Sequence, residues 1–256
     1  QEYLATLGLD TMLPRQCAMH IQSNVPSGIG LASSAAVFAA LAEAYAGFTL
    51  PKRSLTRAEV SVLARTGSGS ASRSVLGGFV AMEAGKDDAI DSAKAVQIAP
   101  ENHWQLHDII IAPNMNEKKV GSSEGHALAR TSPFFTERIE AITHRRQRAC
   151  IDAILKRDFE ILQKVAEEDA LDMHRVMETS VPPLQYLSDQ TYIILEEILS
   201  LRQKKHLPVL YTMDAGPTVH LICTNEAIKD VREFSLSQKK NKIFEAKIGR
   251  GSYLLQ

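Results

Sequence analysis

Residues 26–44, PSGIGLASSAAVFAALAEA, place two glycines, a proline and two adjacent serines directly before an alanine-rich segment. Alanine is the best helix former, so the sequence predicts a helix from Ser33 to Ala46 that ends at Gly47. The first turn of a helix presents unpaired amides and a partial positive charge, and glycine lets a bulky group approach the backbone. The pattern therefore predicts an anion site, although a surface loop before an ordinary buried helix has the same composition.

Composition limits the class of protein. The chain has 256 residues, of which 45% are hydrophobic and 23% charged, which is enough for one large or two modest cores in a globular protein. Its net charge of −1 gives no field that would attract nucleic acid or an acidic membrane. The basic runs at 144–148 and 239–242 lack interleaved aromatic residues, so we expect solvated surfaces there.

The cysteines and the N-terminal sequence indicate the cellular compartment in which we expect the protein. Cys17, Cys150 and Cys223 are far apart and odd in number, so they predict neither a disulfide framework nor a zinc site. We expect a reducing compartment, the cytoplasm, because the sequence also has no apolar run of membrane-spanning length and no signal-peptide pattern. The chain does not begin with methionine, which predicts residues upstream of it.

Strand and helix patterns alternate in the first half. Period-two or continuous apolar patterns predict strands at 17–23, 74–83 and 107–113, and a helix with Ser/Thr-type caps is predicted at 54–66. From Ser132 the pattern is almost wholly helical. We therefore predict one domain over residues 1–130 and a second over 131–256.

The last part of the chain predicts a sheet backed by helices. A helix ending at Lys205 precedes two short strands in LPVLYTMDAGPTVHLIC (207–223), which flank an Asp-Ala-Gly-Pro turn. A helix at 225–236 and a strand at 243–249 follow. This order of elements predicts an α+β domain with an antiparallel sheet.

Three further stretches carry polar groups suited to anions. GSGSASRSVLGG (67–78) places Ser68, Ser70 and Ser72 before Arg73, and hydroxyls with a guanidinium suit phosphate or carboxylate oxygens. NEKKVGSSEG (116–125) carries lysines before serines, and Asp214 follows an apolar strand. Each stretch alone is also compatible with an ordinary turn or solvated loop. Together they supply phosphate clamps, positive charge and a carboxylate, which favours an enzyme that transfers a phosphoryl group from ATP.

The motifs resemble a known family. PSGIGLASSAA is similar to the phosphate-binding motif of the GHMP kinase superfamily. GSGSASRSVLGGFV and YTMDAGPTV resemble its decarboxylating branch, the diphosphomevalonate decarboxylases, as do KKVGSSEGH and DMHRVMETSVPPLQYL. The superfamily's kinases carry a glycine-rich third motif where this chain has Asp-Ala-Gly-Pro, and that difference selects the branch.

The resemblance implies a fold and a reaction. The fold would be a two-domain, GHMP-kinase-like α+β fold, with an N-terminal α/β domain like domain 2 of ribosomal protein S5 and the active site between the domains. The enzyme would use ATP and Mg²⁺ to phosphorylate the 3-hydroxyl of mevalonate 5-diphosphate. Loss of phosphate and CO₂ would then give isopentenyl diphosphate, a step of isoprenoid biosynthesis in the mevalonate pathway. The partner would be this small molecule, and the family suggests a homodimer.

The resemblance also implies roles for individual residues. Asp214 would act on the 3-hydroxyl as base or orienting group, and Arg73 would bind substrate anions. Lys119 and Ser34 complete the expected catalytic set, with Ser34 beside Mg²⁺. The substrate would be bound by Ser68, Gly69, Ser70 and Arg73, and the nucleotide by Pro26, Gly28, Gly30, Leu31, Ala32, Ser33, Ser34, Lys118 and Ser122. His220 is expected at a strand position beside this site, and Met173 and His174 are expected in a helix core or interface.

Two other functions stay open. A GHMP-type enzyme acting on a related mevalonate phosphate, a kinase for example, would use the same anion-binding parts. A non-catalytic homologue is the other, because the family's early motif Asn-Ile-Ala-x-Ile-Lys-Tyr-Trp-Gly-Lys does not occur in this sequence.

Overall fold

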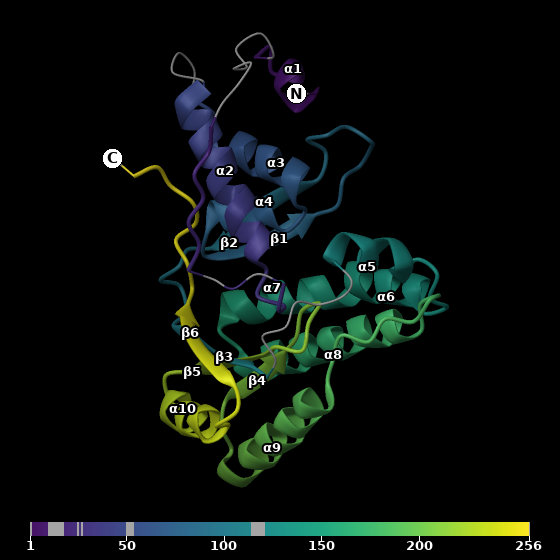
Figure 1. Cartoon of the computed structure of the whole chain (residues 1–256), viewed down its shortest axis with the longest axis vertical. Coiled ribbons are helices and arrows are strands. Elements are labelled where there is room, and N and C mark those ends of the chain that lie inside the picture. The colour runs from purple at the N-terminus through teal and green to yellow at the C-terminus, as the bar shows by residue number, and fades with distance from the viewer. Residues whose placement is uncertain are drawn as a thin grey trace. The chain divides into compact units, whose positions relative to one another are not determined.

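The computed structural model describes residues 2–9, 18–24, 26, 28–49, 54–113 and 121–255. The chain forms two compact units, each described by itself below (Figure 1). The first unit consists of Gln1–Val25, Ala32–His103 and Gly249–Gln256, and the second of Pro26–Leu31 and Trp104–Ile248. The glycine-containing stretch before the alanine-rich helix therefore belongs to the second unit, whereas the helix itself belongs to the first.

The first unit packs small helices on a two-stranded sheet. Its elements are α1 (Glu2–Thr6), α2 (Ser33–Thr49), α3 (Arg57–Gly67), α4 (Ala71–Leu76), β1 (Phe79–Glu83) and β2 (Lys94–Ala99), and the two strands pair antiparallel. Alanines from α2 pack with Val60 and Ala64 of α3 and with Ala71 and Val75 of α4. The absence of long side chains lets these three helices approach closely, which explains the alanine-rich composition of α2.

Several predictions for this unit hold and two are wrong. Helix α2 forms as expected but continues past Gly47 to Thr49. Helix α3 begins at the predicted cap, because Thr56 and Glu59 form a reciprocal capping box. The segment expected as a strand at 17–23 is wrong for the described residues 18–23, which are exposed and without regular structure. A strand needs a neighbouring strand for its backbone groups, and neither of the described sheets includes these residues.

The second wrong prediction is a continuous strand over 74–83. Residues up to Leu76 belong to α4, and β1 begins only at Phe79. Between them Gly77 and Gly78 both have a φ of +68°, which L side chains rarely adopt. A Cβ at Gly77 would lie 2.2 Å from the backbone carbon of Arg250, so the glycine is also needed for close backbone packing.

The second unit contains a four-stranded antiparallel sheet. Its strands are β3 (Leu106–Ala112), β4 (Val209–Thr212), β5 (Val219–Thr224) and β6 (Lys242–Lys247), in the order β4-β5-β3-β6. Its helices are α5 (Ser122–Ala129), α6 (Phe135–Ala141), the π-helical turn η2 (Ile142–Arg146), α7 (Gln147–Lys156), α8 (Phe159–Glu178), α9 (Asp189–Lys205) and α10 (Ile228–Ser237). The antiparallel sheet and the helical run from Ser132 confirm the predicted pattern, and the boundary between residues 130 and 131 stays a prediction.

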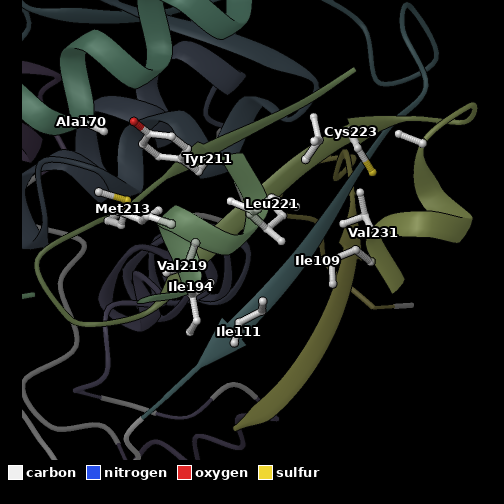
Figure 2. Packing of buried hydrophobic residues seen from close by; sticks show 14 of the residues in the cluster. Ile109, Ile111, Ala170, Ile194, Tyr211, Met213, Val219, Leu221, Cys223 and Val231 are labelled. Atoms are coloured by element: carbon white, nitrogen blue, oxygen red, sulfur yellow. The ribbon is translucent and has the colours of Figure 1, made fainter. Parts of the chain in front are cut away.

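One face of this sheet holds the main core. Alternate residues of the strands, among them Ile109, Ile111, Val219 and Leu221, are buried against α9 and α10 (Figure 2). The intervening residues of the same strands, such as Asp108, Ile110 and His220, belong to the opposite face. The sequence alternation in β5 therefore separates a wholly apolar layer from a face that carries polar side chains.

The basic run at 144–148 is only partly the solvated surface that the sequence predicts. Arg148 is exposed, but Arg146 is buried and its guanidinium bonds Asp172 at 2.5 Å, Glu168 at 3.1 Å and Asp169 at 3.3 Å, all on α8. The hydrogen bond from Arg145, with a smaller contribution from Arg146, lowers the pKa of Glu168 to about 2. The basic run thus joins η2 to α8 through ion pairs.

None of the described helices is both long and apolar enough to cross a bilayer.

Candidate functional site

Asp214 lies in the loop between β4 and β5 of the second unit. Met213, the residue before it, is buried in the main core, whereas Asp214 itself is exposed. The amide of Gly216 donates a hydrogen bond to the Asp214 carbonyl at 2.8 Å, which turns the chain sharply after the carboxylate. The loop therefore presents a carboxylate to solvent from a rigid, buried base.

The glycine-containing segment Pro26–Leu31 packs on this same loop. A Cβ at Gly30 would lie 3.2 Å from the Gly216 Cα, and a Cβ at Gly216 would lie 2.8 Å from the Ile29 carbonyl oxygen. Two backbones touch here, and only glycine on both sides allows it. The structure thus brings together two of the predicted motifs, the glycine segment with Gly30 and the loop with Asp214, within one unit.

Two hydroxyl groups fix the contact. Thr218, which is fully buried, donates a hydrogen bond from Oγ1 to the Ile29 carbonyl at 2.5 Å. Thr191, in the capping box of α9, donates to the Pro217 carbonyl at 2.9 Å. The glycine segment is therefore attached to the Asp214 loop, and the loop is attached to the start of a helix.

A histidine and a carboxylate lie on the polar face of the sheet beside this contact. His220 Nδ1 lies 2.8 Å from Asp108 Oδ2. Burial of the ring favours its neutral form and lowers its pKa. This effect is outweighed by the hydrogen bond and charge of Asp108, by the charge of Asp214 and by the Gly30 backbone. Together they raise the pKa of His220 above its ordinary value, which favours an imidazolium at this position.

A second histidine interacts with the backbone of Met213, the residue before Asp214. His174 of α8 is 2% exposed, its ring meets that of Tyr186 edge to face, and the Met213 backbone interacts with it. Among the described residues neither ring nitrogen has a hydrogen bond of good geometry. Burial dominates and lowers the pKa of His174 to about 4, so the ring is neutral near pH 7.

The glycine segment has the backbone conformation of an anion-binding turn. Gly28, Gly30 and Ala32 have φ values of +74°, +90° and +47°, so alternate residues are left-handed up to the start of α2. Backbones that alternate in this way turn successive N–H groups toward one side and form a concave anion site. Ser33 and Ser34 follow as the first residues of α2, and Pro26 and Leu31 bound the segment within the second unit.

The serines and the arginine predicted to bind substrate lie together in the first unit. Ser68 Oγ and Ser70 Oγ are 3.3 Å apart, and Gly69 between them is exposed. Arg73 lies one turn further on and is exposed, so its guanidinium is available to an anion. Ser72 differs from its neighbours because it is buried and donates to the Gly69 carbonyl at 2.9 Å, which makes it structural.

The third predicted stretch is only partly described. Lys118 and Lys119 lie outside the described residues. Ser122 is the first residue of α5, whose N-cap is Gly121, and its side chain also lies outside the description. The roles expected for these residues stay predictions.

Sequence reasoning missed two contributors to the site. Asp108 was hidden within the apolar strand HDIIIAP, and Thr218 lies just before the strand that follows the turn. His174, expected in a helix core or interface, is buried on α8, which confirms that expectation. A charged residue inside an otherwise apolar strand was the available signal for Asp108, because such a group needs a partner.

The architecture of the chain matches a known class of fold. A mixed helix and sheet architecture with this glycine segment is that of the GHMP-like fold. Residues 8–94 match the diphosphomevalonate decarboxylase-like N-terminal domain, and residues 109–247, more than half of the chain, match the mevalonate 5-diphosphate decarboxylase C-terminal domain. The chain belongs to the mevalonate diphosphate decarboxylase family.

Individual relatives agree with this assignment. The diphosphomevalonate decarboxylase of Candida albicans is 38% identical over 226 residues, covering 86% of this chain and 61% of the relative. The human protein of the same name is 33% identical, covering 84% of this chain and 54% of the relative. This chain therefore spans a little more than half of the length of these curated relatives.

Solved structures share the fold. Mevalonate diphosphate decarboxylase from Staphylococcus aureus has a TM-score of 0.80 and 34% identity, covering 89% of this chain and 68% of that one. A structure described as MDDEF in complex with MVAPP, AMPPCP and magnesium has a TM-score of 0.77 and 32% identity, with the same coverage of each chain.

The contact between the two glycines makes a stability prediction. Gly216→Ala places a Cβ against the backbone at Ile29 and Gly30, so we expect a loss of about 2 kcal/mol of unfolding free energy. Gly249→Ala is the matched control, because a Cβ there meets nothing within 4 Å, and should change stability by less than about 0.5 kcal/mol. Denaturant unfolding measures both, and equal effects would contradict the proposed contact.

The buried His174 makes a pH prediction. Its pKa is about 4 in the folded protein against 6.5 ordinarily, so the unfolded chain binds more protons below pH 6.5. The contribution of the neutral His174 to the unfolding free energy is therefore fully present above pH 6.5. It decreases as the pH drops, by up to about 3 kcal/mol in total, and changes no further below pH 4. His174→Gln cannot titrate, so its unfolding free energy should fall less between pH 7 and pH 4.5. An unchanged pH dependence would show that this ring is not buried in its neutral form.

Proposed function

We propose that the protein catalyses ATP-dependent decarboxylation of mevalonate 5-diphosphate to isopentenyl diphosphate, in isoprenoid biosynthesis. The observation that carries this proposal is the attachment of the glycine segment to the Asp214 loop. An anion-binding turn and an exposed carboxylate on one rigid support are the arrangement that phosphoryl transfer to a hydroxyl needs. The family and its relatives support the same reaction, and the solved relative in complex with MVAPP, AMPPCP and magnesium supports the ligands.

Asp214 is the proposed catalytic carboxylate. It accepts the proton of the 3-hydroxyl, or orients that hydroxyl, while the hydroxyl oxygen bonds to the γ-phosphorus of ATP. The bond from that phosphorus to the bridging oxygen breaks at the same time, and ADP leaves with its electron pair. Phosphate then leaves with the electron pair of the carbon–oxygen bond, and the pair of the carboxyl carbon–carbon bond forms the alkene as CO₂ departs. A nearby carboxylate also stabilises the positive character that develops at the tertiary carbon.

The remaining residues bind the two anions. Gly28, Gly30, Leu31 and Ala32, with Pro26 before them, form the backbone turn for the nucleotide phosphates, and the serines at the start of α2 follow it. Ser33 contributes to phosphate binding, and Ser34 lies beside Mg²⁺. MgATP, when bound, supplies the phosphoryl group.

The substrate is proposed to bind through the first unit. Arg73 pairs with its carboxylate or diphosphate, and Ser68, Gly69 and Ser70 add hydroxyls and amides. Lys118, Lys119 and Ser122 are proposed to approach the nucleotide or the transferred group.

The oligomeric state and the cellular location of the protein are also proposed. We propose a homodimer, on the evidence of the family alone. A cytoplasmic location is supported by Cys150 and Cys223, which are free thiols, and burial raises the pKa of both.

Asp214→Asn tests the catalytic assignment in the complete polypeptide. With MgATP and mevalonate 5-diphosphate, we expect CO₂, ADP and isopentenyl diphosphate from the wild type, and a rate at least about 100-fold lower from the variant. Substrate affinity measured by calorimetry should be retained. Asp152→Asn, an exposed surface change on α7, should leave the rate unaltered.

The products distinguish the alternatives. A stable phosphate ester without CO₂ would identify a kinase of the same superfamily, and failure to bind MgATP would identify a non-catalytic homologue. Undiminished decarboxylation by the Asp214→Asn variant would refute the role given to this carboxylate.

A further inference from the structure

Helix α4 of the first unit, which carries Arg73, is a short helix that depends on its surroundings. It has 6 residues, Ala71–Leu76, whereas an isolated helix needs roughly 12–15 to be stable in water. The carbonyls of the last turn of a helix also have no partner within the helix, so other groups must donate to them. The position of Arg73 is therefore set by the groups that hold this end of α4.

Two of these donors come from a strand and from a segment distant in the sequence. On β2, Gln97 Nε2 donates to the Leu76 carbonyl at 3.3 Å and to the Gly77 carbonyl at 3.0 Å. The amide of Ser252 donates to the Ser74 carbonyl at 3.1 Å. The end of α4 is thus attached to the chain around residue 252, almost 180 residues further along the sequence.

Arg57, the first residue of α3, joins this attachment into one cluster. Its Nη2 donates to the Val75 carbonyl of α4 and, at 2.8 Å, to the Ser252 carbonyl. Its Nη1 donates to Glu43 Oε2 on α2 at 2.5 Å, and the Ser252 hydroxyl donates to the same oxygen at 2.8 Å. The planar guanidinium presents donors on separate atoms for these bonds, whereas the ammonium group of a lysine is a single point. Three helices and residue 252 therefore meet at one guanidinium.

The backbone before Ser252 lies directly against α4. The amide of Gly78 donates to the Gly249 carbonyl at 2.7 Å. Gly251 has a φ of +85°, and a Cβ there would lie 2.4 Å from the Val75 carbonyl oxygen. A Cβ at Gly249 would meet nothing within 4 Å. Of these two neighbouring glycines, only Gly251 is therefore required by the contact with α4.

The remaining contacts of α4 fix its rotation. Ala71, Ser72 and Val75 are buried, and Ser61 of α3 donates from Oγ to the Ser72 carbonyl at 2.8 Å. Arg73 is exposed. With one face buried and its last carbonyls held, α4 presents the Arg73 guanidinium to solvent in one place on the first unit.

We propose that Arg57 is a positioning residue, which together with residues 249–252 holds α4 so that Arg73 can bind the anionic substrate. This inference rests on the proposed function for its catalytic consequence, because substrate binding by Arg73 is itself proposed, but the contacts do not depend on it. The nucleotide is proposed to bind at residues 26–34, and none of the described hydrogen bonds of Arg57 reaches these residues. Loss of the Arg57 contacts should therefore weaken the binding of one ligand more than that of the other.

Arg57→Gln tests the proposal in the complete polypeptide. The KM for mevalonate 5-diphosphate should rise about tenfold, the value of one charge-assisted hydrogen bond, while kcat and the KM for MgATP change less than about twofold. Deuterium uptake at residues 71–78 and 252 should be about tenfold faster than in the wild type, because the amides of Gly78 and Ser252 donate within this contact. Arg57→Lys keeps the charge but not the planar fork, so its KM for mevalonate 5-diphosphate should rise only about threefold.

Gly251→Ala tests the same contact without changing a charge. Its Cβ would push residue 251 away from the Val75 carbonyl, so we expect the same difference between the two KM values as in Arg57→Gln. Gly249→Ala is the matched control on the same segment. Arg148→Gln, which loses an ion pair with Asp152 on the surface of α7, is the control for loss of a charge. Both controls should behave as the wild type.

Three results would overturn the inference. They are a wild-type KM for mevalonate 5-diphosphate in Arg57→Gln, equal increases in both KM values, which indicate a general loss of structure, and wild-type deuterium uptake at residues 71–78. If the complete wild-type polypeptide releases no CO₂, the proposed function fails. Deuterium uptake in Arg57→Gln and Gly251→Ala, against that in Gly249→Ala, then decides alone whether these residues hold α4.

Discussion

The structure of the second unit depends on a place where two backbones touch without side chains between them. Gly30 and Gly216 come from segments almost 190 residues apart in the chain. A Cβ at Gly216 would lie 2.8 Å from the Ile29 carbonyl oxygen, and a Cβ at Gly30 would lie 3.2 Å from the Gly216 Cα. The contact is reinforced by the buried hydroxyl of Thr218 and extended by Thr191 to the first turn of α9. The glycine segment and the loop that carries Asp214 are thereby packed against each other within one unit.

Polar groups around this support are arranged on the face of the sheet that the main core does not use. The core face of β5 is filled by Val219, Leu221 and Cys223, which gives the strand its stability. The other face is free to carry a charge, and His220 uses it together with Asp108. Period-two alternation in one short strand therefore separates an apolar face from a face that carries a hydrogen-bonded histidine.

The sequence predicted those parts that depend on local pattern. The helix α2, the capped helix α3, the antiparallel strands around Asp-Ala-Gly-Pro and the helical run after Ser132 all follow from residue type and spacing. The segment 18–23 has the alternation of a strand but does not form one, because pairing requires a neighbour that local pattern does not supply. Arg146 was likewise expected in a solvated run, and the π-helical turn η2 joins it instead to the carboxylates of α8.

Contacts distant in sequence were harder to predict. The pair of Asp108 and His220 depends on the register between β3 and β5, which neither strand reveals alone. The glycine segment and Asp214 were both recognised as motifs, but the reason for glycine at position 216 is visible only from the backbone opposite it. A motif therefore predicted the chemistry, whereas the structure shows how two such motifs are joined within one unit.

The central claim is that the proposed nucleotide site depends on the attachment of the glycine segment to the Asp214 loop through Thr218. Calorimetric titration of MgATP into the complete polypeptide carrying Thr218→Val tests it most directly, since valine keeps the volume and removes only the bond to the Ile29 carbonyl. The account predicts affinity about tenfold weaker than that of the wild type, with circular dichroism unchanged. Wild-type affinity in this variant would contradict it.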